Sequence, residues 1–241
     1  MRPDLNRAHN RKPESPRHSK FTRGFTPHAP GSVLVECGRT KVLCTATAMD
    51  QVPAWNPGKA WLTAEYSMLP GSTESRKSRD GRTGRVDGRS YEIQRIIGRS
   101  LRSMLDFSVL PEVTIWLDCD VLSADGGTRT ASINGAAIAL YDLALWMEER
   151  KKVRRSPIRQ LVTAVSVGIV QGVPVVDLDY QEDAQADVDM SMVCTADGKL
   201  VEVQSTAEKT PFDVEQLNTM LKMAKHACQE ILAKQKEALG I

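Results

Sequence analysis

The chain has 241 residues, of which 41% are hydrophobic and 26% are charged, and its formal net charge is +2. That length can bury a full core as one large domain or as two small similar ones, and the composition excludes a disordered chain. Because no apolar run approaches membrane-spanning length and the N-terminal residues are too polar for a signal peptide, we expect a cytoplasmic enzyme or binding protein.

The charged residues are segregated along the chain. Nine Lys or Arg residues stand against four acids between residues 71 and 104, whereas eleven acids stand against two lysines between residues 177 and 215. A basic block and an acidic block suit a site that holds a polyanion together with a divalent cation. The alternative is a pair of solvated faces of opposite sign.

Residues 1–20 are basic, contain three prolines and carry few apolar side chains, which predicts an extended, mobile arm. From Gly31 the pattern changes to β-rich runs at residues 32–36 and 40–48, separated by Cys37-Gly38-Arg39 as in a hairpin. Residues 61–68 predict a further strand.

Residues 71–88 are rich in arginine and glycine and have no hydrophobic periodicity. We expect a long connection there, and long loops of compact domains tend to be functional. A helix is predicted over residues 90–105, with a buried apolar stripe on one side and arginines on the other. Arg89 lies at the N-terminal end of this helix, where a positive side chain gains nothing from the helix dipole, and this hints at an anion nearby.

The central stretch of the chain runs from a β-rich segment at residues 115–122, through Asp125-Gly126-Gly127-Thr128-Arg129, to a predicted helix at residues 131–152. Two adjacent glycines let backbone N–H groups turn toward a common point, to which the helix N-terminus adds partial positive charge. The Thr128 hydroxyl and the Arg129 guanidinium are well shaped to hold phosphate oxygens. The turn is therefore a candidate phosphate site, and the alternative is an ordinary strand-to-helix turn.

The second half repeats the order of strands and then a helix. Two hairpins are predicted, with strands at 161–170 and 173–177, then at 187–195 and 200–205. The last helix is expected to begin with Thr210 as its cap and Pro211 at its first position. The order predicts an α+β chain with an arm at residues 1–20, a first half at 21–155 and a second half at 156–241.

Acidic side chains gather before and within the strand predicted at residues 187–195. Alternate residues of a strand share a face, so Asp187, Asp189 and Ser191 should form one row. Carboxylates that converge repel one another unless a cation lies between them, and oxygen ligands suit Mg²⁺ or Mn²⁺. The alternative is an acidic surface loop.

Cysteine and histidine provide no nucleophile or metal motif. The five cysteines are scattered without metal-ligand spacing, which predicts reduced core residues, and the four histidines lie apart from any candidate nucleophile. The remaining candidate functional groups are arginines, a Gly-Thr-Arg turn and carboxylates. This set is typical of enzymes that catalyse phosphoryl transfer.

Several motifs resemble the bacterial ribonuclease PH family and follow its order. They are Leu62–Pro70, Gly88–Arg95, Cys119–Leu122, Asp125–Ala131, Glu202–Gln204 and Thr206–Glu208. The likeness runs from about Phe21 to the last helix. It implies a ribonuclease PH-like α+β fold, with a first half like the second domain of ribosomal protein S5 and a smaller α+β second half.

The resemblance further implies a phosphorolytic 3′→5′ exoribonuclease, or tRNA nucleotidyltransferase, that trims tRNA precursors and other RNA 3′ ends. Inorganic phosphate attacks the terminal phosphodiester in place of water and releases a nucleoside diphosphate. The family's residues map onto six positions of this chain. Phosphate is expected at Arg89, Gly127, Thr128 and Arg129, and the catalytic pair that binds Mg²⁺ (or Mn²⁺) or acts on the leaving 3′ oxygen is expected at Asp183 and Asp189.

The same resemblance implies a homohexamer, a trimer of dimers, with RNA entering its channel. Arg76 and Arg79 are expected to line that channel or a subunit interface, and Arg95 and Arg99 are further candidates for RNA binding. The chain departs from the family's usual residues at Ser123, Ser191, Ser205 and Lys209 and in the start Asp4-Leu5-Asn6, and it has Gly71 where some members carry Arg. It departs at none of the phosphate positions. Two alternatives stay open: a non-catalytic RNA-binding ring subunit, and a metal-dependent hydrolase that uses the acidic cluster alone.

Overall fold

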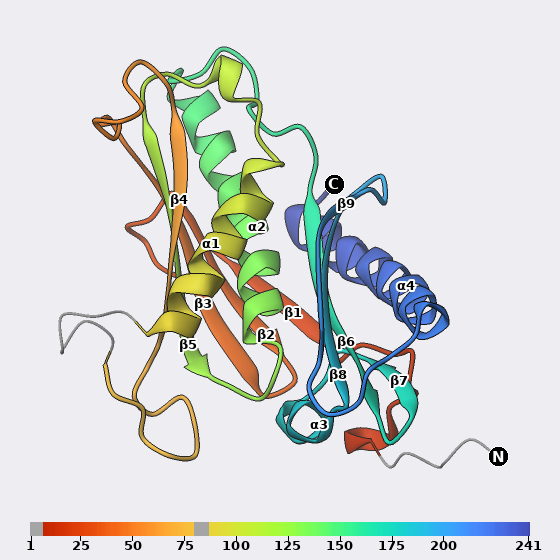
Figure 1. The fold of residues 1–241 in the computed structure, drawn as a ribbon. Coiled ribbons are helices and arrows are strands. Elements are labelled where there is room, and N and C mark those ends of the chain that lie inside the picture. Colours follow the sequence, from red (N-terminus) through yellow and green to blue (C-terminus); the bar gives the residue numbers. More distant parts are fainter. Residues whose placement is uncertain (1–6, 80–86) are drawn as a thin grey trace.

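The computed structural model describes residues 7–79 and 87–241, which fold into two β-sheets with helices between and outside them (Figure 1). The strand order is β1-β2-β3-β5-β4 in the first sheet and β7-β6-β8-β9 in the second. Helices α1 and α2 pack on the first sheet, α2 also contacts β6, and α4 covers the second sheet. The layers are therefore sheet, helices, sheet and helix.

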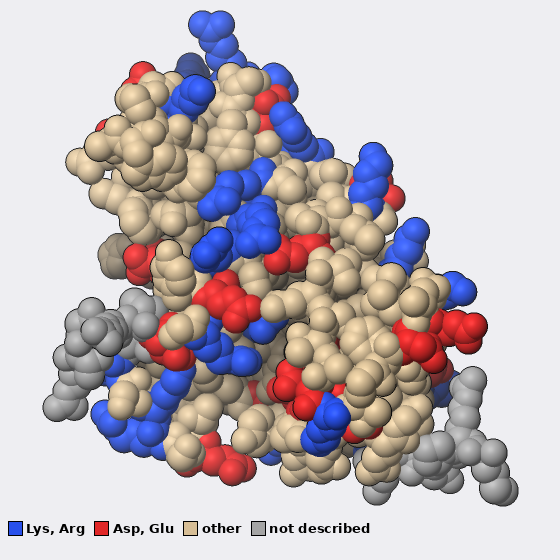
Figure 2. Space-filling view, viewed as in Figure 1, with Lys and Arg blue, Asp and Glu red and all other residues tan. Residues whose placement is uncertain are grey.

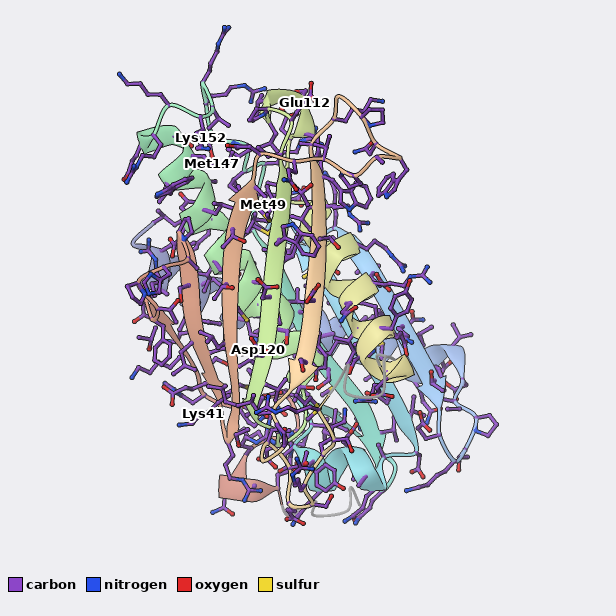
Figure 3. The ribbon with its side chains drawn as sticks, turned by 90° about the vertical axis from the view of Figure 1, so that its left-hand side faces the viewer. Lys41, Met49, Glu112, Asp120, Met147 and Lys152 are labelled. Carbon is purple, nitrogen blue, oxygen red and sulfur yellow. The ribbon has the colours of Figure 1, made fainter. Side chains whose placement is uncertain are left out.

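The first sheet is antiparallel except at one pair. Its strands are β1 (Ser19–Arg23), β2 (Gly31–Cys37), β3 (Thr40–Met49), β4 (Trp61–Met68) and β5 (Thr114–Ser123). β4 and β5 run parallel, and the chain crosses between them through α1 (Gly88–Arg102). Along β5, Leu117 and Cys119 are buried toward the helices while Asp118 and Asp120 face the other way, because side chains of a strand alternate. Figure 3 looks onto that opposite face, with the strands in front of the helices.

Helix α2 (Thr128–Glu149) is buried on nearly all sides because the first sheet and β6 pack against it from two directions. Its sequence of Ala, Gly and Ile residues suits this close packing. Helix α1 has the expected single apolar stripe, with Ile93, Ile97 and Leu101 fully buried. Both helices begin earlier than predicted, so Thr128 and Arg129 lie in the first turn of α2 and not in the loop before it.

The second sheet confirms the two predicted hairpins. Its strands are β6 (Val162–Val170), β7 (Val173–Val176), β8 (Val188–Thr195) and β9 (Leu200–Ala207). Every residue of β6 is buried, as expected for a central strand between α2 and α4 (Val214–Leu239). Gln171 and Gly172 both have positive φ, which is the turn geometry that matches the twist of paired strands.

Residues 7–20 do not form a mobile arm. They include the short 3₁₀ helix η1 (Ala8–Asn10) and the start of β1, which pairs with β2. Arg7 and Arg17 are buried against the second half of the chain. The prediction failed because it counted these arginines as solvated charges, whereas carboxylates distant in sequence pair with them.

Two further predictions about helices were wrong or incomplete. Asp213, not Thr210, caps α4, because Asp213 and Gln216 form a reciprocal capping box. A short helix, α3 (Tyr180–Gln185), was not predicted, although Asp179 and Glu182 form a second capping box at its start. The predicted connection at 71–88 has turns and irregular structure over residues 71–79, and residues 80–86 lie outside the described residues.

The cysteines lie largely where the sequence predicted them, in the core. All five are free thiols; Cys44, Cys119, Cys194 and Cys228 are buried, and Cys37 is half-buried.

In the described part of the chain, no helix combines the length and apolarity that crossing a bilayer requires.

Candidate active site

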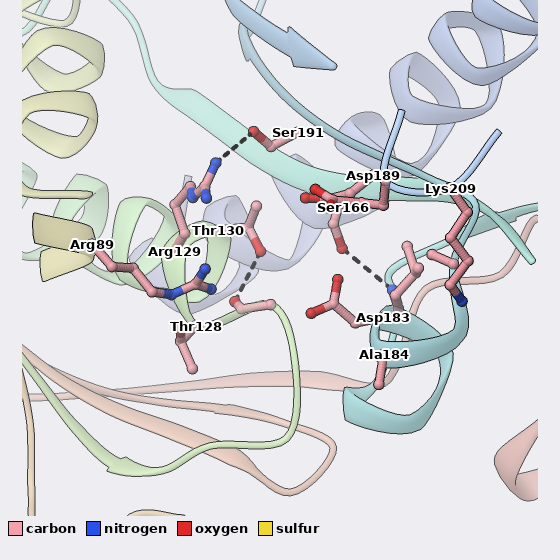
Figure 4. A pocket seen from close by; sticks show the side chains of 14 residues that line it. Arg89, Thr128, Arg129, Thr130, Ser166, Asp183, Ala184, Asp189, Ser191 and Lys209 are labelled. Carbon is pink, nitrogen blue, oxygen red and sulfur yellow. Dashed lines mark hydrogen bonds between the residues drawn. The ribbon is translucent and has the colours of Figure 1, made fainter. Parts of the chain in front are cut away.

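A cavity of about 380 Å³ lies where the N-terminus of α2 meets α3 and the start of β8 (Figure 4). All six residues predicted for phosphate binding and catalysis line it: Arg89, Gly127, Thr128, Arg129, Asp183 and Asp189. They come from four elements that are separated by as much as a hundred residues. The first half of the chain supplies the basic wall, and the second half supplies the acidic wall together with Lys209, which donates to the carbonyl oxygen of Gln185 at 2.8 Å.

The basic wall begins with the turn before α2. Gly127 is the N-cap of α2, with φ of 65° and no capping side chain, so the first backbone N–H groups of the helix are left for a ligand. A side chain at Gly126 would not fit, because a Cβ atom there would lie 2.5 Å from the carbonyl oxygen of Leu178. Tyr66 donates a hydrogen bond to Oγ1 of Thr128 at 2.8 Å. The hydroxyl hydrogen of Thr128 is therefore available to an acceptor.

Side chains of the second sheet hold the guanidinium of Arg129 in place. Its Nη1 donates to Oε1 of Gln204 at 2.7 Å and to Oγ of Ser191 at 3.3 Å. Gln204 in turn donates to Glu92 of α1 at 2.9 Å, so this amide connects β9 with both helices. Arg89 lies at the exposed N-terminal end of α1 and lines the same cavity. Two guanidinium groups thus border a helix N-terminus, which is an arrangement suited to an anion.

The acidic wall consists of Asp183 on α3, Asp189 on β8 and Glu208 just after β9. Desolvation raises the pKa of Asp183, and Arg89 and Arg129 only partly offset that rise. Desolvation also raises the pKa of Asp189, and the charge of Asp183 adds to it. These carboxylates therefore hold a proton more readily than ordinary aspartates do, and they are close enough to repel each other.

In the described residues, no group of three or more His, Cys, Asp or Glu side chains is placed to hold a metal ion. The donor set at the cavity is two aspartates with raised pKa values whose mutual repulsion a divalent cation would relieve. Mg²⁺ is commonly bound through one or two carboxylates, with water and substrate phosphate completing its shell. The residues present fit that mode of binding.

The four arginines predicted to bind RNA lie outside this cavity. Arg76 lines a neighbouring cavity of about 880 Å³, which shares Arg89 with the first and includes Lys77 and Tyr180. Arg79 is exposed on the same segment. Arg95 and Arg99 are exposed on α1, where Figure 2 shows basic side chains gathered beside acidic ones, and Arg99 pairs with Glu202 at 3.3 Å.

The sequence reasoning assigned no role to several residues that support the site. Tyr66 and Gln204 stood in recognised motifs, but their partners could not be read from the sequence. Arg17 pairs with Asp177, whose carboxylate is deeply buried; burial alone would raise the pKa of Asp177, yet Arg17 lowers it. Of these features, only α3 could have been predicted from the local sequence, because Asp179 and Glu182 have the spacing of a capping box.

Two family models match successive parts of the chain. Residues 15–145 match the model described as 3′ exoribonuclease family, domain 1, and residues 160–227 match the model for domain 2. Among solved structures, Rrp46 of rice (Oryza sativa) is 20% identical with a TM-score of 0.79, covering 97% of this chain and 100% of that chain.

Two archaeal structures are similar in the same way. A chain of the Archaeoglobus fulgidus exosome, described with RNA bound to the active site, is 20% identical with a TM-score of 0.82, covering 96% of this chain and 93% of that one. A chain of an archaeal exosome core is 21% identical with a TM-score of 0.77, covering 94% and 89%. These matches confirm the predicted ribonuclease PH-like α+β fold.

Proposed function

Because the chain belongs to the 3′ exoribonuclease family, we propose that it is a phosphorolytic 3′→5′ exoribonuclease that trims the 3′ ends of tRNA precursors. The observation that carries the proposal is the single cavity in which Arg89, Arg129 and the N-terminus of α2 face Asp183 and Asp189. Inorganic phosphate is then the second substrate, and the products are a shortened RNA and a nucleoside diphosphate.

The basic wall holds the attacking phosphate. An oxygen of this phosphate forms a bond to phosphorus of the terminal phosphodiester, and the bond from that phosphorus to the 3′ oxygen of the preceding nucleotide breaks. Two anions must approach each other for this step, so Arg89 and Arg129 are needed to offset their repulsion. The terminal nucleotide leaves with two phosphates, and the freed 3′ oxygen must take up a proton.

The acidic wall acts on the leaving group. With their raised pKa values, Asp183 and Asp189 are suited to hold the proton that the 3′ oxygen needs. The alternative role is that the pair, when ionised, would hold Mg²⁺ (or Mn²⁺), which supplies charge neutralisation at the phosphodiester when it is bound. Glu208 lines the cavity beside them and adds to the negative potential.

RNA approaches through the basic segments around the cavity. Arg76 lines the neighbouring cavity and Arg79 is exposed three residues further along the chain, while Arg95 and Arg99 extend the positive surface along α1. We further propose a homohexamer, a trimer of dimers, in the cytoplasm. Support for a ring comes from the fold that the chain shares with exosome subunits, and light scattering in solution tests the number of copies.

The competing function is a non-catalytic RNA-binding ring subunit. It is favoured by the similarity to Rrp46 and to exosome chains, but that similarity is near 20% identity and concerns the fold. Against it stands the complete set of phosphate and carboxylate residues in one cavity. A subunit without activity needs no such set.

The deciding experiment incubates the full-length protein with a 3′-extended tRNA, with and without inorganic phosphate. We expect shortening only with phosphate and release of nucleoside diphosphates, and we expect Asp189→Asn to abolish it. RNA that shortens equally without phosphate to give monophosphates would indicate a hydrolase. RNA that binds but is never shortened would indicate the ring subunit.

A further inference from the structure

Arg17 connects the two walls of the active-site cavity. Its side chain is 7% exposed and donates to both carboxylate oxygens of Asp177, from Nη2 at 2.7 Å and from Nε at 3.0 Å. The same guanidinium donates from Nη1 to the carbonyl oxygen of Asp125 at 2.5 Å and from Nη2 to that of Gly126 at 3.3 Å. Asp125 and Gly126 belong to the turn that begins α2, whereas Asp177 leads into α3. One buried side chain thus holds both walls.

The two segments that Arg17 joins are packed backbone against backbone. A Cβ atom at Gly126 would meet Leu178, and one at Gly127 would lie 2.8 Å from Nη2 of Arg17. Asp177 has φ of 54°, a left-handed conformation that is costly for a residue with a side chain. The backbone N–H of Arg17 also donates to Asp177, at 2.7 Å, so Arg17 stabilises this strained conformation twice.

The residues before Arg17 hold α3 in a similar way. Arg7, whose side chain is fully buried, donates to Glu182 from Nε at 2.7 Å and from Nη2 at 3.0 Å, and to the carbonyl oxygen of Val176 at 2.7 Å. Arg11 adds a contact to Glu182 at 3.1 Å. A helix of only six residues is not stable by itself. The orientation of α3, and with it that of Asp183, therefore depends on these arginines.

We propose that residues 7–17 are a positioning element of the active site, in which Arg17 sets the placement of the phosphate-binding turn relative to Asp183. This inference rests on the proposed function, because the placement matters only if both walls act on one substrate. Phosphoryl transfer requires the attacking and leaving oxygens to be in line, and a displacement of about 1 Å can cost about 100-fold in rate. Arg17 contacts no reacting atom in this scheme and is a positioning residue.

The test compares two substitutions of Arg17 with a matched control. Arg17→Met removes every contact of the guanidinium, whereas Arg17→Lys keeps the charge but not the planar fork. The control is Arg23→Met, because Arg23 also forms a bidentate ion pair, with Oδ1 of Asp142 from Nη2 at 2.6 Å and with Oδ2 from Nε at 3.1 Å. It also donates to a carbonyl oxygen of α4, away from the cavity. For each full-length variant we would measure the melting temperature, phosphate binding by calorimetry, and the kcat and KM of phosphorolysis.

We expect Arg17→Met to bind phosphate about tenfold more weakly and to lose about 10- to 100-fold in kcat at temperatures where it stays folded. Arg17→Lys should fall between this variant and the wild type. Arg23→Met should lose thermal stability but keep both phosphate affinity and kcat within twofold. Phosphate affinity reports on the turn, and kcat reports on its alignment with Asp183.

The inference is overturned if folded Arg17→Met, or Arg17→Lys where the first variant does not fold, keeps phosphate affinity and kcat within twofold of wild type. If the wild type binds phosphate but does not shorten RNA, the proposed function fails, and phosphate affinity alone then decides the role of Arg17. A wild type that neither binds phosphate nor shortens RNA overturns both.

Discussion

Replacement of Arg129 by lysine should weaken phosphate binding by an amount that follows from its contacts. A guanidinium has five N–H donors, and Nη1 of Arg129 uses two of them on Gln204 and Ser191. Three donors remain, on Nη2 and Nε, and they can form a bidentate fork to phosphate. Lysine offers a single head group and can keep one such bond, so one charge-assisted hydrogen bond disappears, at about 1.5–3 kcal/mol. This corresponds to about a 10- to 150-fold rise in the phosphate concentration required.

The assay for this prediction is nucleoside diphosphate release as a function of phosphate concentration, at saturating RNA. Arg150→Lys is a suitable control, because Arg150 is exposed at the other end of α2, about 30 Å away along the helix. The control should leave the phosphate requirement unchanged. If Arg129→Lys shifts it by less than twofold, Arg129 does not bind phosphate through a fork, and a hydrolase that depends on the carboxylates alone becomes the better description.

Three further predictions concern stability and RNA binding. Asp189→Asn should inactivate the protein yet raise its melting temperature at pH 7. Burial and a neighbouring carboxylate raise the pKa of Asp189, so its ionisation reduces the stability of the wild type as pH rises through that pKa. The difference in melting temperature between variant and wild type should therefore vanish at pH values below the usual aspartate range. Arg7→Met should lower the free energy of unfolding by about 3 kcal/mol at neutral pH, because it breaks a buried ion pair. Burial raises the pKa of Glu182, but the ion pair with Arg7 outweighs burial and lowers it. The stability lost in Arg7→Met should therefore be smaller in acid, where Glu182 is protonated, and urea denaturation at pH 7 and pH 3 would check this. Finally, replacing Arg76 and Arg79 by Gln should weaken RNA binding and reduce the slope of log affinity against log salt by about 0.7 for each phosphate that is no longer neutralised, whereas an affinity unaffected by salt would contradict the basic surface.

The local pattern of the sequence was sufficient for most of the secondary structure. Alternation and turn residues gave the strands and their hairpins, because side-chain periodicity and positive φ are properties of short segments. The Gly-Gly-Thr-Arg turn likewise indicated an anion site, since two glycines before a helix expose backbone N–H groups whatever surrounds them. The beginning of α2 was placed three residues late, because Thr128 carries no sequence signal that separates a turn from a first helical position.

Only the tertiary structure decided how the site is held together. Arg17 and Asp177 are 160 residues apart, and Arg7 and Glu182 are 175 apart, so no pattern within a segment could pair them. From the sequence alone, the six basic residues of the N-terminal stretch are predicted to be solvated, because the carboxylates that pair with some of them are brought close only by the fold. The amino-acid sequence by itself determined which chemical groups the protein has and which elements carry them, because those depend on neighbours along the chain. Their meeting in one cavity depends on how two sheets pack around α2, and that is a property of the whole fold.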